Sequence, residues 1–211
     1  MMVRQLPKAR RIVDLGGGAH VDEGALVYMG YPYPFELLTI VEPPREARHA
    51  SYAGVAPGTL SAVGSRLGPV TYLYQSMASF PSIPDGSVDM VFSGESIEHV
   101  TREECEEVFA EARRVLKPDG WFCFDTPNSL VTHIQCPERY LNPDHKYEYS
   151  CEEMRDLIRR HGFEITEAKG ITLMRETVRS GIFQVGEMVT NVGLYDDIEA
   201  CYLQYYRCRP R

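Results

Sequence analysis

Short apolar runs alternate along the chain with segments whose apolar residues recur at helical spacing. The runs are bounded by turn residues, among them two Pro-Asp-Gly turns at 84–86 and 118–120, and such bounded runs are typical of buried strands. They are RIVDL (11–15), LLTIVE (37–42), VTYLY (70–74), VDMVFS (88–93), WFCFDT (121–126), FEITEA (163–168) and ACYLQYYRC (200–208).

Two helices between these runs begin at recognisable N-terminal signals. Thr101 and Glu104 have the spacing of a capping box, as do Ser150 and Glu153, so each hydroxyl and carboxylate can satisfy a backbone amide of the first turn. Apolar residues follow both boxes at the spacing of one helix face, and Gly162 supplies a stop signal for the second helix.

Strands that alternate with helices predict βαβ units and a mostly parallel sheet covered on both faces. The sequence contains no internal repeat and no long linker. We therefore expect a single domain over residues 1–211, of the α/β class.

The amino-acid composition agrees with a single globular domain and indicates the cellular compartment. The 211 residues are 44% hydrophobic and 25% charged, which suits one globular domain, and no apolar run reaches the roughly 18 residues of a membrane span. The six cysteines form no CxxC pair, which favours reduced, packed thiols. The N-terminal stretch lacks the apolar core of a secretory signal, so we expect a cytoplasmic protein without a membrane partner.

The charge distribution disfavours a nucleic-acid partner. The net charge is −8, and seven of the 22 basic residues lie at the two chain ends. The rest of the chain then carries 15 basic residues against 30 acidic ones, which would repel phosphates. We expect a small-molecule partner instead.

The predicted topology sorts the loops by function, because ligands of an open α/β sheet bind at the carboxyl ends of its strands. Loops that follow strands, at 16–20, 42–46, 75–86, 93–100 and 126–149, belong to this working edge. The aromatic stretch 28–35 falls on the opposite edge. We interpret it as a packed or subunit-contact loop, which leaves a homo-oligomer open.

The first strand ends in a glycine-rich loop, Asp14-Leu-Gly-Gly-Gly18, whose backbone can approach a ligand closely. The dinucleotide fingerprint would require a third glycine at position 21, where Val21 stands. Glu42 ends the second strand and is well placed for both hydroxyls of a ribose. These residues predict a ribose-containing ligand without specifying which one.

The order of several sequence segments narrows the choice of protein family. A strand ending in Asp-x-Gly-x-Gly and one ending in Glu are followed by PDGSVDMVFSGESIEHV (84–100), RVLKPDGWFCFDTPN (114–128) and HGFEI (161–165). Together, over about residues 10–170, they resemble the class I S-adenosylmethionine-dependent methyltransferases, in the small-molecule, type 11-like branch. The resemblance implies a Rossmann-like, doubly wound, mostly parallel seven-stranded sheet with an antiparallel last strand, and S-adenosylmethionine as cofactor.

The resemblance also implies roles for particular residues. By this resemblance, the methionine moiety and the sugar of the cofactor would lie against Asp14, Gly16, Gly17 and Gly18, and the ribose hydroxyls would bind Glu42. Ser76 and Met77 would form the adenine-binding turn, and Ser93 would begin the loop under the methyl group. Many relatives have Asp where Ser76 stands, and a small residue where His20 stands.

The acceptor is expected under two cap segments at about 127–149 and 170–199. Asp144-His145 resembles an Asp-His element of related methyltransferases, so we predict His145 as general base and Asp144 as its orienting or substrate-binding partner. A shaping role for His145 and a positional role for His99 stay open. Asp125, Asp144 and His145 could converge, but no metal-ligand spacing is present and no metal is predicted.

These features predict a methyltransferase that modifies an oxygen or nitrogen of a small molecule, with a saccharide or a natural-product intermediate as candidates. Arg175 and Arg179 in the second cap would pair with an anionic acceptor or carry solvated charge. Two alternatives from other classes remain: a nicotinamide-dependent oxidoreductase, which Val21 disfavours, and a non-catalytic cofactor-binding partner subunit, which the intact 14–18 loop disfavours. A protein or RNA methyltransferase also stays open, although the acidic composition disfavours RNA.

Overall fold

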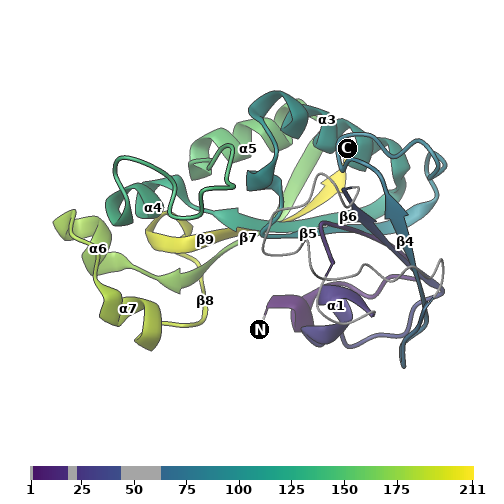
Figure 1. Cartoon of the computed structure of the whole chain (residues 1–211), viewed down its shortest axis with the longest axis horizontal. Helices are drawn as coiled ribbons and strands as arrows, with labels where there is room; N and C mark the ends of the chain where they lie inside the picture. The colour runs from purple at the N-terminus through teal and green to yellow at the C-terminus, as the bar shows by residue number, and fades with distance from the viewer. Residues whose placement is uncertain (1, 19–22, 44–62) are drawn as a thin grey trace.

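The computed structural model describes residues 2–18, 23–43 and 63–211 and shows one twisted sheet with helices on both faces (Figure 1). The described residues form nine strands in the order β3-β4-β2-β1-β5-β6-β9-β7-β8. Their bounds are β1 (Arg11–Leu15), β2 (Leu37–Glu42), β3 (Val63–Gly64), β4 (Pro69–Tyr74), β5 (Val88–Gly94), β6 (Leu116–Pro127), β7 (Phe163–Leu173), β8 (Leu194–Tyr195) and β9 (Cys201–Pro210).

Five neighbouring strands, β4, β2, β1, β5 and β6, pair in parallel. β9 pairs antiparallel with β6 on one side and with β7 on the other. The expected mostly parallel α/β sheet with an antiparallel last strand is therefore confirmed. The two further strands, β3 and β8, have two residues each and add antiparallel edges to the seven that the sequence predicts.

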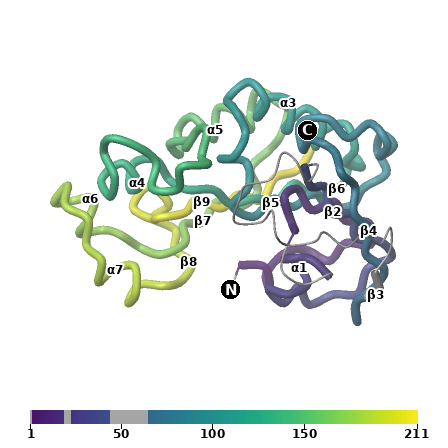
Figure 2. Tube along the Cα trace, viewed as in Figure 1, coloured from purple at the N-terminus to yellow at the C-terminus, as the bar shows by residue number. Residues whose placement is uncertain are grey.

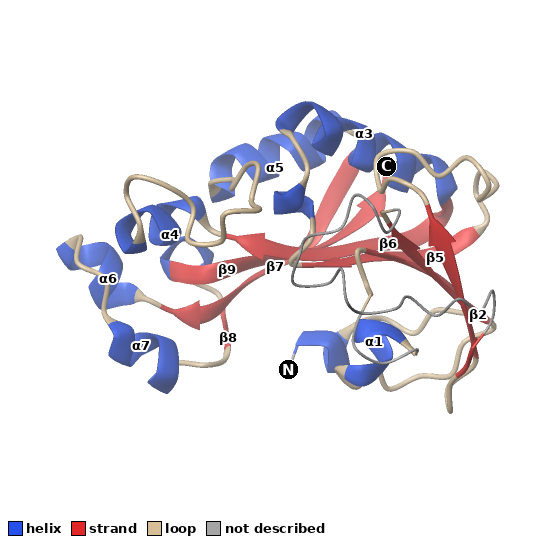
Figure 3. Cartoon of the chain, in the orientation of Figure 1, coloured by secondary structure: helices blue, strands red, loops and turns tan. Residues whose placement is uncertain are grey.

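The helices divide between the two faces of the sheet (Figure 3). α3 (Arg102–Val115) and α5 (Cys151–Arg160) pack on one face, while α1 (Gly24–Tyr28) and the 3-10 turn η1 (Met2–Gln5) cover the other. Both predicted capping boxes are present: Thr101 Oγ1 accepts from the Glu104 amide, and Ser150 Oγ accepts from the Glu153 amide.

The remaining helices gather at the far end of the sheet, where Figure 2 shows α4, α6 and α7 grouped near β8. They are α4 (Ser129–Gln135), α6 (Arg175–Ser180) and α7 (Val185–Thr190). Two further 3-10 turns are η3 (Ile97–His99) and η4 (Ile198–Ala200). These helices lie within the two segments that the sequence analysis treats as caps, which therefore contain regular structure.

Phe109 is the aromatic centre of the α3 face. Its ring is fully buried and lies 5.1 Å from that of Phe122, 5.4 Å from that of Phe124 and 6.3 Å from that of Phe163. One helix residue thereby joins α3 to two sheet strands, β6 and β7.

We expect Phe109→Ala to lower the free energy of unfolding by about 3–5 kcal/mol, because it removes buried area and leaves a cavity. Urea denaturation followed by circular dichroism measures this. Glu107→Ala, at an exposed position of the same helix, is the control and should change stability by less than about 0.5 kcal/mol. Equal losses for the two variants would contradict the assignment of Phe109 to the core.

Candidate active site

The carboxyl ends of four parallel strands meet along one edge of the sheet. Asp14 on β1 lies in register with Ile40 on β2 and with Phe92 on β5, and Gly94 on β5 lies beside Asp125 on β6. This is the edge that the sequence analysis selects as the working edge, and its polar residues come from segments far apart in the chain.

Asp14 is fully buried, and neither of its carboxyl oxygens has a hydrogen-bond partner among the described residues. Burial raises the pKa of Asp14 to about 8; the nearby charge of Glu42 adds to the effect, and the backbone amide of Leu26 opposes it. An unsatisfied carboxyl group in this position is costly unless a donor or a cation completes it.

The glycine-rich loop lies directly against this carboxyl group. A Cβ added at Gly17 would sit 2.0 Å from Asp14 Oδ2, so only glycine fits there. Gly16 has a φ of +72°, and its amide donates to the Val41 carbonyl at 2.9 Å. The loop backbone thus covers the end of β1 and holds Asp14 beneath it.

Glu42 is the second carboxylate of this group. Its Oε1 accepts a hydrogen bond from the Gly18 amide at 2.5 Å, and a Cβ at Gly18 would come within 2.5 Å of the same oxygen. The arrangement fits a ligand that carries both a positive amino group and ribose hydroxyls, because one carboxylate lies buried under the loop and the other lies at its rim.

The other predicted cofactor residues lie nearby. Met77 approaches the loop, its terminal methyl 3.7 Å from where a Gly16 Cβ would be. Ser76 Oγ accepts from the Ala78 amide at 3.1 Å, and the buried Ser93 hydroxyl has no partner among the described residues. Their roles toward a cofactor stay predictions. His20 and Val21 lie outside the described residues.

The first cap segment is tied to the strand edge through η3. The Glu98 carbonyl accepts from the amides of Lys146 and Tyr147, at 2.7 and 3.3 Å. These main-chain bonds fix His145 beside the end of β5, although 51 residues separate the end of that strand from it.

His145 is oriented by a carboxylate that the sequence analysis missed. Its Nδ1 lies 2.5 Å from Glu148 Oε1, and the other oxygen of Glu148 accepts from the Thr132 hydroxyl. A carboxylate other than that of Asp144 thus contacts the His145 ring, and the two roles predicted for Asp144 stay predictions. Burial alone would raise the pKa of Glu148, but the bonds from His145 and Thr132 outweigh it and lower the pKa.

Two further buried carboxyl groups lie around this histidine. Glu98 Oε2 accepts from the Thr126 hydroxyl at 3.0 Å, and burial raises the pKa of Glu98 to about 8. Burial also raises the pKa of Asp125 to about 8, with the charge of Glu95 adding to it. The His99 ring meets the His145 ring edge-to-face, with centroids 4.8 Å apart.

Comparison with known proteins places this geometry in a family. Residues 48–124 match the family model of a methyltransferase domain. A probable S-adenosylmethionine-dependent methyltransferase of Mycolicibacterium smegmatis is 33% identical over 113 residues, which cover 54% of this chain and 42% of that protein. The chain thus spans about two fifths of the length of this curated relative.

Solved structures share the fold over nearly the whole chain. An S-adenosylmethionine-dependent methyltransferase of Thermotoga maritima matches with a TM-score of 0.64 and 19% identity, covering 98% of this chain and 84% of that one. One from Mesorhizobium loti matches with a TM-score of 0.64 and 16% identity, covering 99% and 95%. The chain therefore resembles the class I S-adenosylmethionine-dependent methyltransferases in sequence over part of its length and shares their fold.

The structure has a cavity of about 740 Å³ in the first cap segment, lined by His133, Pro137, Glu138, Arg139, Tyr140, Leu141 and Pro143. The rings of His133 and Tyr140 stack there with centroids 6.1 Å apart, and Tyr140 lies 6.3 Å from His145. A ligand-sized space therefore adjoins the oriented histidine.

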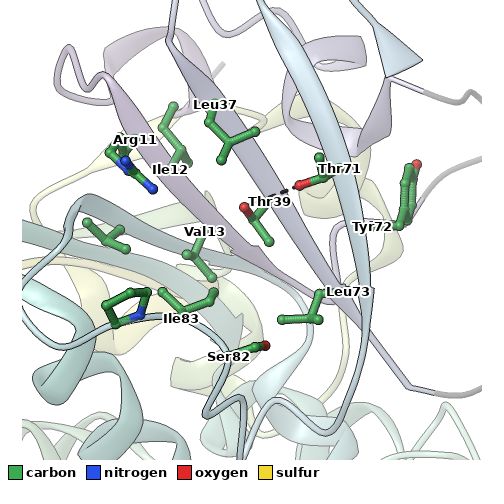
Figure 4. A pocket seen from close by; sticks show the side chains of 12 residues that line it. Arg11, Ile12, Val13, Leu37, Thr39, Thr71, Tyr72, Leu73, Ser82 and Ile83 are labelled. Carbon is green, nitrogen blue, oxygen red and sulfur yellow. Dashed lines mark hydrogen bonds between the residues drawn. The ribbon is translucent and has the colours of Figure 1, made fainter. Parts of the chain in front are cut away.

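Another cavity, of about 220 Å³, lies away from this edge (Figure 4). Arg11 and Leu37, which line it, begin β1 and β2, and Thr71 Oγ1 donates to Thr39 Oγ1 at 3.4 Å on its wall. The chain between β4 and β5 covers this part of the sheet with a loop at 82–84 instead of a helix. The cavity belongs to the packing of that face and not to the candidate site.

Other candidates from the sequence fall outside the site. In the stretch 28–35, Tyr31 is buried and its hydroxyl donates to the Pro7 carbonyl at 2.9 Å, whereas Tyr28, Met29 and Tyr33 are exposed. The choice between a packed loop and a subunit-contact loop therefore stays open. Arg175 pairs with Asp197, and Arg179 pairs with Glu176. Both arginines are thus engaged at the surface.

We expect Asp14→Asn to stabilise the ligand-free protein increasingly as pH rises from 4 to 8. In this window the folded state keeps the proton of Asp14 while the unfolded chain releases it, so the stability of the natural protein falls as pH rises. The amide has no charge to lose. At about 1.4 kcal/mol per pKa unit, the gap should reach several kcal/mol near pH 8.

Urea denaturation at pH 5 and pH 8 checks this expectation. Asp119→Asn, at an exposed position of β6, is the control and should show no such pH-dependent gain. A constant difference between Asp14→Asn and the natural protein at both pH values would show that Asp14 ionises normally.

Proposed function

We propose that this protein transfers the methyl group of S-adenosylmethionine to an oxygen or nitrogen of a small molecule. One observation carries the proposal: the cradle around Asp14 and the oriented His145 share one strand edge. Ser96 joins them, because its hydroxyl oxygen lies 2.5 Å from the Cβ position of Gly16 and the η3 turn that anchors the cap follows directly after it.

S-adenosylmethionine supplies a methyl group on a sulfonium centre, and the acceptor attacks the methyl carbon in line and displaces the sulfur. In the proposed complex Asp14 faces the positive amino group and Glu42 the ribose hydroxyls, so the chain supplies alignment more than chemistry. His145 takes the proton of an acceptor hydroxyl at Nε2. Glu148, held by Thr132, fixes the tautomer and stabilises the ring when it becomes positive.

The cavity beside His145 supports a small acceptor. Its volume of about 740 Å³ is within the range of small-molecule sites, and Tyr140 offers a ring face against which a sugar or an aromatic ring can pack. Saccharides and natural-product intermediates with free hydroxyl groups are therefore the acceptors that we propose.

A cytoplasmic location fits the state of the cysteines. All six are free thiols, and five of them are buried, as expected in a reducing compartment. Among the described residues, no helix has both the length and the apolar character to cross a membrane.

We expect calorimetric titration to show micromolar binding of S-adenosylmethionine and S-adenosylhomocysteine and no binding of NAD or NADP. Glu42→Ala should weaken binding of the sulfur cofactors about 10-fold or more, because hydrogen bonds to a charged group contribute about 1.5–3 kcal/mol. Glu36→Ala, at an exposed position one residue before β2, is the control. Preference for a nicotinamide cofactor would overturn the proposal.

We expect His145→Ala to lower kcat by about 10²–10⁴, the contribution of a positioned acid–base group, and to leave the affinity for S-adenosylmethionine unchanged. Release of S-adenosylhomocysteine with a panel of hydroxylated acceptors measures turnover. His161→Ala is a matched control, since His161 also contacts a carboxylate, Glu106, at 2.6 Å, but outside the site. Full turnover by His145→Ala would remove the proposed base.

A further inference from the structure

A group of metal-ligating atoms lies at the centre of the candidate site. Glu98, His99 and His145 each present one donor atom, and these atoms all lie within 4.8 Å of one another. Three donors around one tetrahedral ion with bonds of about 2.1 Å lie about 3.4 Å apart. The three donor atoms would therefore have to approach one another by up to about 1.4 Å to bind a single ion.

Main-chain hydrogen bonds hold these three residues close together. Glu98 and His99 belong to η3, which follows β5 directly. The Glu98 carbonyl accepts the amides of Lys146 and Tyr147, so the residue that follows His145 is tied to the turn that carries the other two. The cluster is thus a product of main-chain geometry.

His145 is prepared as a metal ligand by its neighbour. Because the Glu148 carboxylate can only accept, the ring nitrogen 2.5 Å from it, Nδ1, carries the proton. Nε2 then presents a lone pair. A carboxylate behind a histidine is the outer-shell arrangement that orients histidine ligands and raises their basicity, and Thr132 in turn holds Glu148.

The charges around the cluster favour a cation. Glu98 is 1% exposed and Asp125 is 5% exposed, and Asp125 Oδ1 has no hydrogen-bond partner among the described residues. Glu95 lies close enough to affect both carboxyl groups and adopts a positive φ of 45°, a strained conformation for a residue other than glycine. Buried carboxyl groups gathered in this way are normally paired or bound to metal.

We propose that Glu98, His99 and His145 bind a divalent first-row transition-metal ion that activates the hydroxyl group of the acceptor. Two imidazoles with a carboxylate suit Mn²⁺, Fe²⁺, Co²⁺ or Zn²⁺, and three protein ligands leave positions open for the acceptor. The role in activation rests on the proposed methyl transfer, whereas binding of the ion does not.

The ion changes the part that His145 plays in the reaction. A hydroxyl group bound to a divalent ion loses its proton to solvent near neutral pH, since the ion stabilises the alkoxide. The oxygen then forms a bond to the methyl carbon, the carbon–sulfur bond breaks, and its electron pair stays on sulfur. His145 acts through Nε2 as a ligand, and an acceptor with two adjacent hydroxyl groups would bind most tightly.

Titration of the chelator-stripped, dialysed protein with MnCl₂ tests the site without any acceptor. Calorimetry and the loss of the free Mn²⁺ paramagnetic resonance signal should show one ion per chain with micromolar affinity. His99→Ala and His145→Ala should each weaken binding at least 10-fold. His161→Ala should bind as the natural protein does, and circular dichroism with S-adenosylmethionine titration establishes that each variant is folded.

The outcomes separate this inference from the proposed function. Absence of Mn²⁺ binding by a protein that binds S-adenosylmethionine would overturn the metal site and leave methyl transfer intact. Stoichiometric Mn²⁺ binding that both histidine variants retain would also overturn it, because the ion would lie elsewhere. Mn²⁺ binding that depends on His99 and His145, in a protein that does not bind S-adenosylmethionine, would support the metal site and contradict the proposed function.

Discussion

The parallel pairing of β1 with β2 on one side and β5 on the other is the constraint on which the rest of the structure depends. This register brings Asp14, Glu42 and Ser93 to one edge, although they are distant in sequence. A slip of one residue would turn every side chain of a strand to the opposite face, moving Val13 and Leu15 of β1 out of one core cluster and Ile12 out of the other. The site and the core are therefore set by the same hydrogen bonds.

That edge also concentrates the polar groups that folding leaves unsatisfied. Asp14, Ser93 and Asp125 lie near the carboxyl ends of three neighbouring strands, and each has a buried oxygen without a partner among the described residues. Such groups cost stability in the ligand-free protein. The cost is offset only when a ligand supplies the missing partners, which links the stability of the strand edge to occupancy of the site.

Local signals in the sequence were sufficient to predict most of the fold. β1 and β2 have the predicted bounds, and α3 and α5 begin at the predicted capping boxes, because runs and caps depend on near neighbours. α4 was not predicted: its apolar residues are few, and Asn128, which caps it by accepting the Leu130 amide, was interpreted as part of a loop. The predicted turn at 118–120 lies within β6, where the pairing with β5 is irregular between Val88 and Met90.

The site was predictable only in part, because local sequence signals do not reveal contacts between segments that are distant in the chain. Asp14 and Glu42 follow strands directly, so topology alone placed them at the working edge. Glu148 could not be identified as the partner of His145, because the adjacent Asp144 offered the same chemistry and only the fold of the cap turns Glu148 inward. Glu98 precedes a capped helix in an unremarkable polar stretch, and its proximity to His145 arises from main-chain bonds across 48 residues.

The cofactor cradle and the cap obey different constraints. The cradle depends on backbone that tolerates only glycine at Gly17, whereas the wall of the cavity at 137–143 meets the rest of the site through the ring contacts of Tyr140 and hydrogen bonds at Asn142. Side chains on that wall can change without moving the strand edge. His145 lies between the cradle and the cap. Glu148 and Thr132 orient its ring from the cap, while main-chain bonds to Glu98 hold it near the end of β5. Acceptor selectivity can therefore vary around a reacting position that stays fixed.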